Sequence, residues 1–362
     1  MDILTEADAL LARGDAQSAI ALLSRAIAEG RGGLLTRVRL GRAYLANGDP
    51  PAALEVLRET SVLAPGMADA ALALGEALMA AGHLPAAVAE FQRATRLDPD
   101  LVAAPYALGL AWLEAGEPDK AMEILRPIAE TQSPLAQKAA RKIAQARAMK
   151  TAERAPANYV RHLFDQFSYD YDTRMLRELD YRAHDILRAF AGLLLSGATN
   201  LDILDLGCGT GLCGASFKDL ARRLEGVDLS PRMIEKALAR GIYDALFVSD
   251  LQTVLHGDGP AYDLLIAADT LVYLGDLAPV LSGAVKRLRP GGFFFFTVER
   301  KEDEGYALGE KRRYRHSEAY LRMESSRAGF DVMGLMQCSP RTEAHKPVDG
   351  LAVALQLPQI AG

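Results

Sequence analysis

Hydrophobic and small residues repeat every 34 positions over the first 135 residues of the chain. A period of this length is typical of stacked helix pairs, because each pair buries its apolar face only against its neighbours. Glycine suits the turn between the two helices, small residues let the helices approach, and a large apolar residue fills the seam. We therefore predict an all-α repeat array with a final capping helix within residues 126–150. The equivalent positions are Gly14, Gly48, Gly82 and Gly116; Ala19, Ala53, Ala87 and Ala121; Ala7, Gly41, Gly75 and Gly109; and Leu23, Leu57, Phe91 and Leu125.

Beyond residue 157 the pattern changes to short apolar runs that alternate with helical stretches. This alternation predicts parallel strands joined by crossover helices. After a helix at about 317–328, the last two runs are joined by too few residues for a crossover helix, so we expect them to pair antiparallel. The predicted strands are 202–206, 224–228, 245–248, 264–267 and 293–298, followed by 330–338 and 351–356. The chain thus divides into an array at 1–150 and an α/β domain at 151–362, in which 151–190 forms a linker and lid helices.

Charge and composition narrow the possible functions. The 362 residues carry a formal net charge of −6, and the pI is near 5.6. No basic field is available for phosphate contacts, so we do not expect nucleic acid as a partner. We also expect no membrane segment, because no apolar run reaches about 18 residues. The acidic N-terminus lacks a charged and then apolar leader, which favours the cytoplasm. Three cysteines without a C-x-x-C pair indicate neither a disulfide framework nor a metal site.

The most informative segment is a glycine-rich turn, 205–211, at the end of an apolar run. Glycine has no Cβ and accepts positive φ, so a ligand can approach the bare backbone between a strand and a helix. Asp228 ends the next apolar run, 17 residues after Gly211. A carboxylate at that strand end can accept hydrogen bonds from two ribose hydroxyls, which indicates a nucleoside ligand. The spacing G-x-G-x-G differs from the G-x-G-x-x-G of dinucleotide sites, although a dinucleotide or a purely structural turn remain alternatives.

The turn sequence D-L-G-C-G-T-G resembles the signature of class I S-adenosylmethionine (SAM)-dependent methyltransferases. This resemblance implies a Rossmann-like, seven-stranded sheet, with SAM as the cofactor. Family members that methylate amino groups of bases carry N-P-P-Y after the fourth strand; this chain reads Ala-Asp-Thr-Leu there, which disfavours DNA adenine as the acceptor. The implied roles are Asp205 facing the methionine ammonium, Gly207, Cys208, Gly209 and Gly211 cradling the methionine portion, Asp228 and Leu229 at the ribose, Asp250 and Leu251 at the adenine, and Asp269 near the transferred methyl.

An aromatic stretch at 159–172 precedes the sheet. Its sequence resembles the F-D-x-x-A-x-x-Y-D segment that covers the cofactor in small-molecule methyltransferases and in bacterial predicted methyltransferases with tetratricopeptide repeats, with Ser168 in place of the alanine. The resemblance implies a lid closed by Phe164 and Tyr171. The alternative is a helix packed permanently on the sheet.

The acceptor side is predicted around the polar stretch 312–317. His316, Tyr273 and Glu299 are the candidate catalytic residues, and Arg313, Tyr314 and Arg315 are the candidate substrate-binding residues. Guanidinium groups can bind a carboxylate, and a histidine can take a proton from a hydroxyl, which weakly favours an oxygen acceptor on a small molecule or a protein. The alternative is a solvated loop in which Ser317 caps the next helix.

The repeats themselves resemble tetratricopeptide repeats (TPRs) over about residues 1–135. This resemblance implies a groove that binds a protein or peptide partner; the alternative is that the array packs on the second domain or dimerises. The predicted function is a methyltransferase with a recruiting array, and the alternative is a scaffold whose nucleoside domain does not catalyse transfer. The implied groove residues are Leu4, Leu11, Val38, Leu45, Leu72, Met79, Tyr106 and Leu113.

Overall fold

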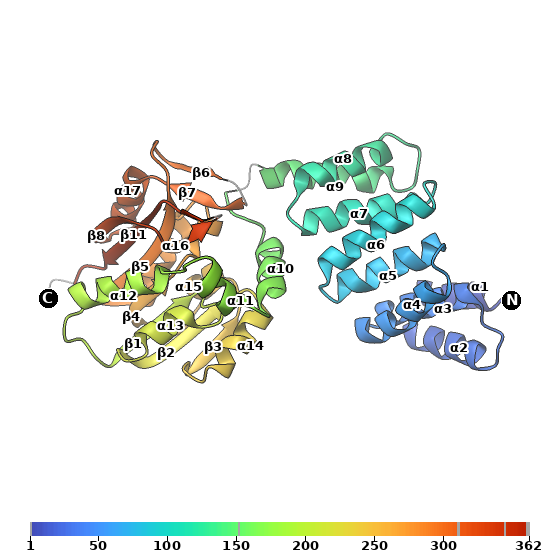
Figure 1. Cartoon of the computed structure of the whole chain (residues 1–362), viewed down its shortest axis with the longest axis horizontal. Coiled ribbons are helices and arrows are strands. Elements are labelled where there is room, and N and C mark those ends of the chain that lie inside the picture. The colour runs from blue at the N-terminus through green and yellow to red at the C-terminus, as the bar shows by residue number, and fades with distance from the viewer. Residues whose placement is uncertain (1, 151–152, 310–311, 344, 360–362) are drawn as a thin grey trace. The chain divides into compact units, whose positions relative to one another are not determined.

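The computed structural model describes residues 2–150, 153–309, 312–343 and 345–359. The chain forms two compact units, Met1–Thr151 and Ala152–Gly362 (Figure 1). The predicted domain boundary falls at Thr151 and Ala152, which lie outside the described residues. In the parts of the chain that the structure describes, no helix combines the length and the apolarity that crossing a membrane requires.

The N-terminal unit is the predicted array of paired helices, each packed on the next (Figure 1). The four glycines of the turn set have φ between 69° and 80°, a left-handed conformation that L side chains rarely adopt. These positions explain why glycine recurs every 34 residues. The helices are α1 (Ile3–Ala12), α2 (Ala16–Ala28), α3 (Leu34–Ala46), α4 (Pro50–Leu63), α5 (Ala68–Ala80), α6 (Leu84–Leu97), α7 (Ala103–Glu114), α8 (Pro118–Ala129) and α9 (Ala136–Lys150).

The second glycine set lies inside the helix pairs, as the pattern predicts. A Cβ on Gly75 would lie 2.5 Å from the ring of Phe91, which is fully buried. The absence of a side chain therefore lets the large residue of the second helix seat against the first. Gly41 with Leu57 and Gly109 with Leu125 repeat this contact.

The structure corrects part of the predicted groove. Val38, Leu72 and Leu113 are at most 6% exposed and belong to the cores of the array. These three side chains hold the helices together, so they are not available to a partner. The other five predicted groove residues, Leu4, Leu11, Leu45, Met79 and Tyr106, are half-buried.

The C-terminal unit is built on a mostly parallel sheet with the strand order β3-β2-β1-β4-β5-β11-β8. The last two runs pair antiparallel as predicted, with β11 between β5 and β8. Sequence patterning missed four short strands: β6 and β7, of which β7 extends the sheet beside the end of β5, and the small hairpin of β9 and β10. The strands are β1 (Leu201–Leu206), β2 (Ala221–Asp228), β3 (Ala245–Val248), β4 (Tyr262–Ala267), β5 (Leu288–Arg300), β6 (Tyr306–Leu308), β7 (Tyr314–His316), β8 (Asp331–Cys338), β9 (Thr342–Glu343), β10 (Lys346–Pro347) and β11 (Gly350–Gln356).

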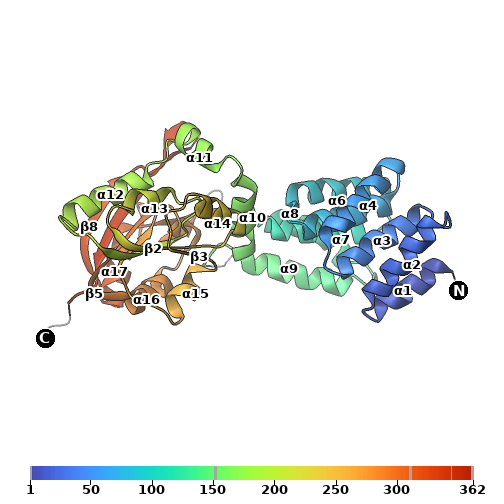
Figure 2. The ribbon, with the colours of Figure 1, turned by 90° about the horizontal axis from the view of Figure 1, so that it is seen from below.

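Helices cover both faces of this sheet, in separate layers (Figure 2). The four consecutive phenylalanines of β5 show why: Phe293 and Phe295 pack under α12 and α13, whereas Phe294 and Phe296 pack under α15, α16 and α17. Alternate residues of a strand face opposite sides, so one apolar run supplies two cores. The helices are α10 (Ala157–Phe167), α11 (Tyr171–Thr173), the π-helix η1 (Arg174–Glu178), α12 (Ala183–Leu194), α13 (Leu212–Phe217), α14 (Pro231–Ala239), α15 (Leu251–His256), the 3-10 helix η2 (Leu271–Tyr273), α16 (Ala278–Arg287) and α17 (Glu318–Ala328).

Candidate functional site

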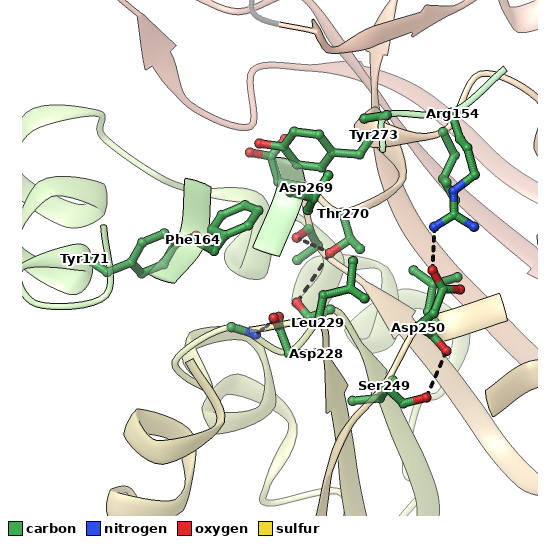
Figure 3. A pocket seen from close by; sticks show the side chains of 18 residues that line it. Arg154, Phe164, Tyr171, Asp228, Leu229, Ser249, Asp250, Asp269, Thr270 and Tyr273 are labelled. Atoms are coloured by element: carbon green, nitrogen blue, oxygen red, sulfur yellow. Dashed lines mark hydrogen bonds and ion pairs between the residues drawn. The ribbon is translucent and has the colours of Figure 1, made fainter. Parts of the chain in front are cut away.

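A pocket opens at the carboxyl ends of β1, β2, β3 and β4, where ligands bind in open α/β sheets (Figure 3). Segments far apart in the sequence form its walls, from the strand ends to α10 and α11. The structure thus brings most of the predicted cofactor residues together. Those that line the pocket are Phe164, Tyr171, Gly207, Gly209, Asp228, Leu229, Asp250, Leu251 and Asp269, together with the predicted catalytic residue Tyr273.

The glycine turn follows β1 with three left-handed residues. Gly207, Gly209 and Gly211 have φ of 69°, 54° and 92°. Gly211 is the N-cap of α13 and, like Cys208, does not line the pocket. Cys208 is buried beneath the turn. The turn therefore presents the backbone of Gly207 and Gly209 to the pocket, and the Thr270 side chain packs against Gly207 from the end of β4.

Asp228 fixes the geometry between the first two strand ends. Its carboxylate accepts hydrogen bonds from the backbone N–H of Gly209 at 2.9 Å and from that of Ser230 at 2.8 Å. Burial raises the pKa of Asp228 to about 6, although these donors oppose the shift. Each carboxylate oxygen has two lone pairs, so Asp228 retains capacity for further donors such as hydroxyl groups.

Asp205 lies behind the turn and does not line the pocket. It is fully buried, and its carboxylate accepts a hydrogen bond from the Tyr243 hydroxyl at 2.7 Å. Burial raises the pKa of Asp205 to about 7, and the nearby Asp228 adds to the shift. Asp205 therefore has no direct contact with the pocket, and the implied interaction with a ligand ammonium through water stays a prediction.

Asp250 stands at the end of β3, where it caps α15 by accepting from the N–H of Gln252 at 2.8 Å. Its other carboxylate oxygen is ion-paired with Arg154, whose guanidinium also donates to the Gln252 side chain at 3.0 Å. Arg154 lines the pocket as well. Sequence reasoning did not identify this residue, because nothing in the local pattern signals a contact 96 positions away.

Two aromatic residues of the stretch before the sheet, Phe164 and Tyr171, line the pocket. Phe164 packs edge-on against Tyr171 and Tyr273, with ring centroids 6.2 and 5.6 Å apart. Burial raises the pKa of Tyr171 well above its usual value, and the neighbouring Asp269 adds to this shift, so its hydroxyl stays protonated. Whether the segment opens as a lid remains a prediction.

Two carboxylates of the same stretch anchor it to the glycine turn and to α14. Asp165 accepts from the Ser230 hydroxyl at 2.5 Å, beside Asp228. Asp172 accepts from the Thr210 hydroxyl and forms an ion pair with Arg240. Both aspartates belong to the F-D-x-x-S-x-x-Y-D segment, so that motif was a signal for them, although no role was predicted.

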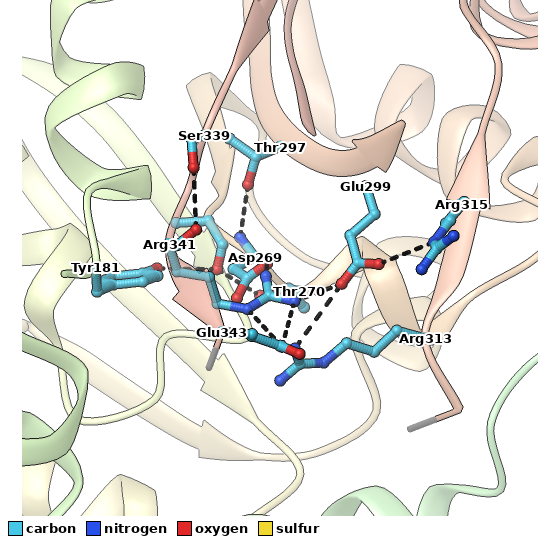
Figure 4. Close-up of polar contacts among 11 residues, drawn as sticks. Tyr181, Asp269, Thr270, Thr297, Glu299, Arg313, Arg315, Ser339, Arg341 and Glu343 are labelled. Atoms are coloured by element: carbon cyan, nitrogen blue, oxygen red, sulfur yellow. Dashed lines mark hydrogen bonds and ion pairs between the residues drawn. The ribbon is translucent and has the colours of Figure 1, made fainter. Parts of the chain in front are cut away.

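A buried charge cluster lies beside the pocket, at the end of β4 and β5 (Figure 4). Arg341 is at its centre: it is 1% exposed and pairs with Asp269, Glu299 and Glu343. Asp269 has φ of 56°, and its N–H donates to the Thr297 hydroxyl at 2.8 Å. The cluster thus holds Asp269 at the pocket wall.

The predicted substrate-binding residues are mostly engaged inside this unit. Arg313 pairs with Glu343 and lies 3.8 Å from Glu299. Arg315 lies 3.6 Å from Glu299 and does not line the pocket. Tyr314 is buried against Tyr306. These pairings correct the expectation of a basic patch open to an acidic substrate, because the charges of Arg313 and Arg315 are matched by neighbouring carboxylates.

His316 is also corrected. It is fully buried on β7, stacks on Tyr320, and donates from Nε2 to the carbonyl of Gly275 at 2.9 Å. Burial lowers its pKa to about 4, and it does not line the pocket. This placement argues against His316 as the base that meets a substrate. The predicted alternative was right that Ser317 caps α17, since its hydroxyl accepts from the N–H of Tyr320, but the segment is not a solvated loop.

Glu299 is held in the charge cluster and does not line the pocket either, which leaves Tyr273 as the predicted catalytic residue at the pocket wall. Over the ranges that the structure describes, no group of three or more His, Cys, Asp or Glu side chains is arranged to hold a metal ion.

Comparison with protein families gives matches in both units. Residues 204–294 match the family model described as "Methyltransferase domain", and residues 10–63, 38–102 and 72–136 match models described as "Tetratricopeptide repeat". The chain contains a methyltransferase domain preceded by tetratricopeptide repeats. The methyltransferase match spans β1 to the first half of β5, the part that carries the glycine turn and the four strand ends of the pocket.

Curated relatives of this methyltransferase domain include two bacterial enzymes. The malonyl-[acyl-carrier protein] O-methyltransferase of Salmonella typhimurium is 30% identical over 105 residues, which are 29% of this chain and 41% of that protein. The ubiquinone biosynthesis O-methyltransferase of Methylocella silvestris is 32% identical over 111 residues, 30% of this chain and 43% of that protein. The chain thus spans less than half the length of either relative.

Solved structures with a similar methyltransferase domain include two that contain S-adenosylhomocysteine (SAH). The 1,6-didemethyltoxoflavin-N1-methyltransferase of Burkholderia thailandensis is 20% identical, with a TM-score of 0.45 over 57% of this chain and 91% of that one. The magnesium protoporphyrin IX methyltransferase of Synechocystis PCC 6803 is 16% identical, with a TM-score of 0.45 over 55% of this chain and 98% of that one.

Proposed function

We propose that this protein is a SAM-dependent methyltransferase whose cofactor lies in the pocket at the ends of β1 to β4. The observation that carries the proposal is the meeting of the glycine-rich turn with Asp228 and Asp250 at three adjacent strand ends. When SAM is bound, Gly207 and Gly209 would hold its methionine portion, Asp228 would accept from the ribose hydroxyls, and Asp250 and Leu251 would hold the base. The methyltransferase family match supports this assignment.

Methyl transfer from a sulfonium is an in-line displacement: the acceptor forms a bond to the methyl carbon while the carbon–sulfur bond breaks and sulfur keeps the electron pair. Sulfur would become neutral, and the positive charge would leave with the acceptor's proton, so exclusion of water and orientation matter more than a strong acid. Phe164, Tyr171 and Tyr273 supply the dry wall. Asp269, held by Arg341, is the carboxylate at the acceptor side that can take the acceptor's proton.

We further propose an oxygen acceptor. The two curated relatives described above are both named O-methyltransferases, which supports this choice, whereas the basic patch that first suggested it is paired with carboxylates. Incubating the protein with methyl-labelled SAM and fractionated cell extract, and then identifying the labelled product, tests the acceptor. Label in an ester or an ether supports oxygen, and label in an amine contradicts it.

The rival function is a scaffold that binds the nucleoside without transfer. Titration calorimetry with SAM, SAH and a nicotinamide dinucleotide, followed by the labelling assay, separates the two. Saturable binding of SAM and SAH with label transfer supports the enzyme, and binding without transfer to any fraction supports the scaffold. Binding of the nicotinamide dinucleotide without binding of SAM or SAH would contradict both the enzyme and the scaffold functions.

For the repeat array we propose recruitment of a protein or peptide through the half-buried apolar residues of α1, α3, α5 and α7, which are Leu4, Leu11, Leu45, Met79 and Tyr106. Tetratricopeptide family matches over residues 10–136 support this role. A Tyr106→Asp variant is expected to lose partner capture from extract while it keeps SAH binding. Val62→Asp is the matched control, because Val62 is 80% exposed and outside the predicted groove. A cytoplasmic location stays a prediction.

A further inference from the structure

The segment Glu153–Ala155, which we name the strap, is bound to the wall of the cofactor pocket. The N–H of Ala155 donates to the carbonyl of Tyr273 at 2.8 Å, and the carbonyl of Glu153 accepts from the N–H of Gly275 at 2.6 Å. Arg154 forms an isolated antiparallel bridge with Leu274 between these bonds. The strap thus runs as a short added strand along the loop that contains two pocket residues, Tyr273 and Leu274.

Gly275 shows how close this contact is. A Cβ at Gly275 would lie 2.8 Å from the backbone oxygen of Glu153, closer than real Cβ atoms approach, so the loop accepts the strap only because residue 275 is glycine. The strap begins three residues after α9 ends, and it is therefore part of the covalent connection between the repeats and the methyltransferase domain.

The side chain of Arg154 reaches from the strap to Asp250 at the end of β3 (Figure 3). Its guanidinium bridges the Asp250 carboxylate and the Gln252 amide oxygen. One Asp250 oxygen caps α15 and Arg154 engages the other, so a ligand would meet a carboxylate that already has a donor on each oxygen. Under the proposed function, the exocyclic amine of the adenine base would donate to this same carboxylate.

We propose that Arg154 sets the affinity of the pocket for its cofactor: it competes with the nucleoside base for Asp250 and must release or share that carboxylate when cofactor binds. This inference rests on the proposed function, because it takes Asp250 as the acceptor for the base. It assigns to the strap a role in cofactor affinity that no local sequence motif carries.

The ion pair between Arg154 and Asp250 determines whether removal of Arg154 raises or lowers the affinity for SAH. The side chains of Arg154 and Asp250 are 36% and 20% exposed, so their pair contributes only about 0.2–1 kcal/mol, which corresponds to a change in affinity of about 1.4-fold to fivefold. Removing the guanidinium frees Asp250, so SAH binds more tightly. If Arg154 instead acted as a direct ligand of the base, its removal would weaken binding.

Titration calorimetry of SAH on the full-length protein tests this inference. Arg154→Met keeps an unbranched apolar stem at the pocket wall and is expected to bind SAH about 1.4-fold to fivefold more tightly than the wild type. Arg154→Lys keeps the charge but not the forked donor geometry, and is expected to lie between the two. Arg177→Ala is the matched control: this exposed arginine of η1 lies outside the pocket, and SAH affinity is expected to be unchanged.

A salt titration of the wild type gives a second readout that does not depend on any variant folding. SAH carries no net charge at neutral pH, whereas the Arg154 pair is partly exposed and is screened by salt. Between about 0.05 and 0.5 M salt the wild-type affinity is expected to rise toward that of Arg154→Met, whose own affinity changes less.

The outcomes separate the two proposals. Equal or weaker SAH binding by Arg154→Met, with the wild type still binding, or a wild-type affinity that falls as salt rises, overturns the role of Arg154 and leaves the methyltransferase assignment intact. If neither the wild type nor Arg154→Met binds SAM or SAH at any salt concentration, the proposed function itself fails.

Discussion

Thr270, after β4, packs directly against the backbone of Gly207, after β1. A Cβ on Gly207 would lie 2.3 Å from Thr270 Cγ2, and the Thr270 hydroxyl donates to the Gly207 carbonyl at 3.3 Å. Glycine is thus required at position 207 for two reasons: the backbone has a positive φ, and Thr270 leaves no room for a Cβ. Gly209 has a positive φ of 54° but nothing within 4 Å of its Cβ position.

This difference makes a matched pair of variants. Gly207→Ala combines backbone strain with overpacking, and we expect it to lower the free energy of unfolding by about 2–4 kcal/mol and to abolish SAH binding. Gly209→Ala carries the backbone strain alone, and we expect a loss of about 1–2 kcal/mol. Calorimetric unfolding and SAH titration check both. Equal destabilisation by the two variants would contradict the role of Thr270.

The ionisation of Asp228 predicts the pH dependence of cofactor binding. Because its folded-state pKa is raised to about 6, the carboxyl group is mostly protonated at pH 5 and ionised at pH 8. The ionised form accepts ribose hydroxyls better, so we expect SAH affinity to rise about fivefold to tenfold from pH 5 to pH 8.

Two variants test this assignment. Asp228→Asn should flatten the pH profile of SAH affinity and weaken binding at pH 8. Asp205→Asn removes the other buried carboxyl group with a raised pKa, and we expect the step near pH 6 to persist. A profile that is flat in the wild type, or that reverses its sign, would refute the role given to Asp228.

Substitution of Arg341 is expected to lower the free energy of unfolding of the methyltransferase domain strongly. In Arg341→Met, Asp269 and Glu299 stay buried without their shortest ion pair, which predicts a loss of about 3–5 kcal/mol in the free energy of unfolding. Arg315→Met is the control: its side chain is 51% exposed and pairs with Glu299 at 3.6 Å, so we expect less than about 1 kcal/mol.

The site of any such loss can be localised by fluorescence. Trp112 is the one tryptophan of the sequence and lies in α7, so its emission reports on the repeat array. We expect the Trp112 fluorescence transition in urea to stay unchanged in Arg341→Met. The part of the circular-dichroism signal that comes from the methyltransferase domain is expected to be lost at a lower urea concentration. A shift of both transitions together would show that the two units do not unfold separately.

His316 provides a test of its reassignment from base to core residue. Its pKa is lowered to about 4 in the folded state, so the unfolded state binds more protons between about pH 4 and 6.5. His316 therefore contributes a stability that is present above that window and lost as pH falls through it, by about 1–3 kcal/mol. In His316→Gln we expect less loss of stability between pH 7.5 and pH 5 than in the wild type, and unchanged SAH affinity at pH 7.5. A weakened SAH affinity in His316→Gln would indicate that His316 contributes to the functional site.

The repeat array and the strand ends were predictable because their signals are local. The 34-residue period follows from turns that need positive φ and seams that need small residues, as Gly75 against Phe91 illustrates. The glycine turn and Asp228 are likewise read from the ends of apolar runs, and the structure places them in one pocket. Even the two cores on either side of β5 follow from the alternation of Phe293 to Phe296.

The acceptor side was not predictable in this way. The sequence of residues 313–316, with two arginines and a histidine, suggests a polar surface. In the structure β7 pairs with the end of β5, where Glu299 and Glu343 form ion pairs with Arg313 and Arg315. His316 is buried and has no access to the pocket. Charged residues have no period that marks their partners. Whether an arginine is free or paired depends on which distant carboxylate the fold brings to it.

The sequence by itself determined the repeat array, the main strands and the glycine-rich turn, because backbone conformation and hydrophobic periodicity are local properties. Only the tertiary structure decided that Arg154 faces Asp250 and that Arg341 supports Asp269, across 96 and 72 positions. These pairs depend on the packing of whole strands and helices, so they exist only once the chain has folded.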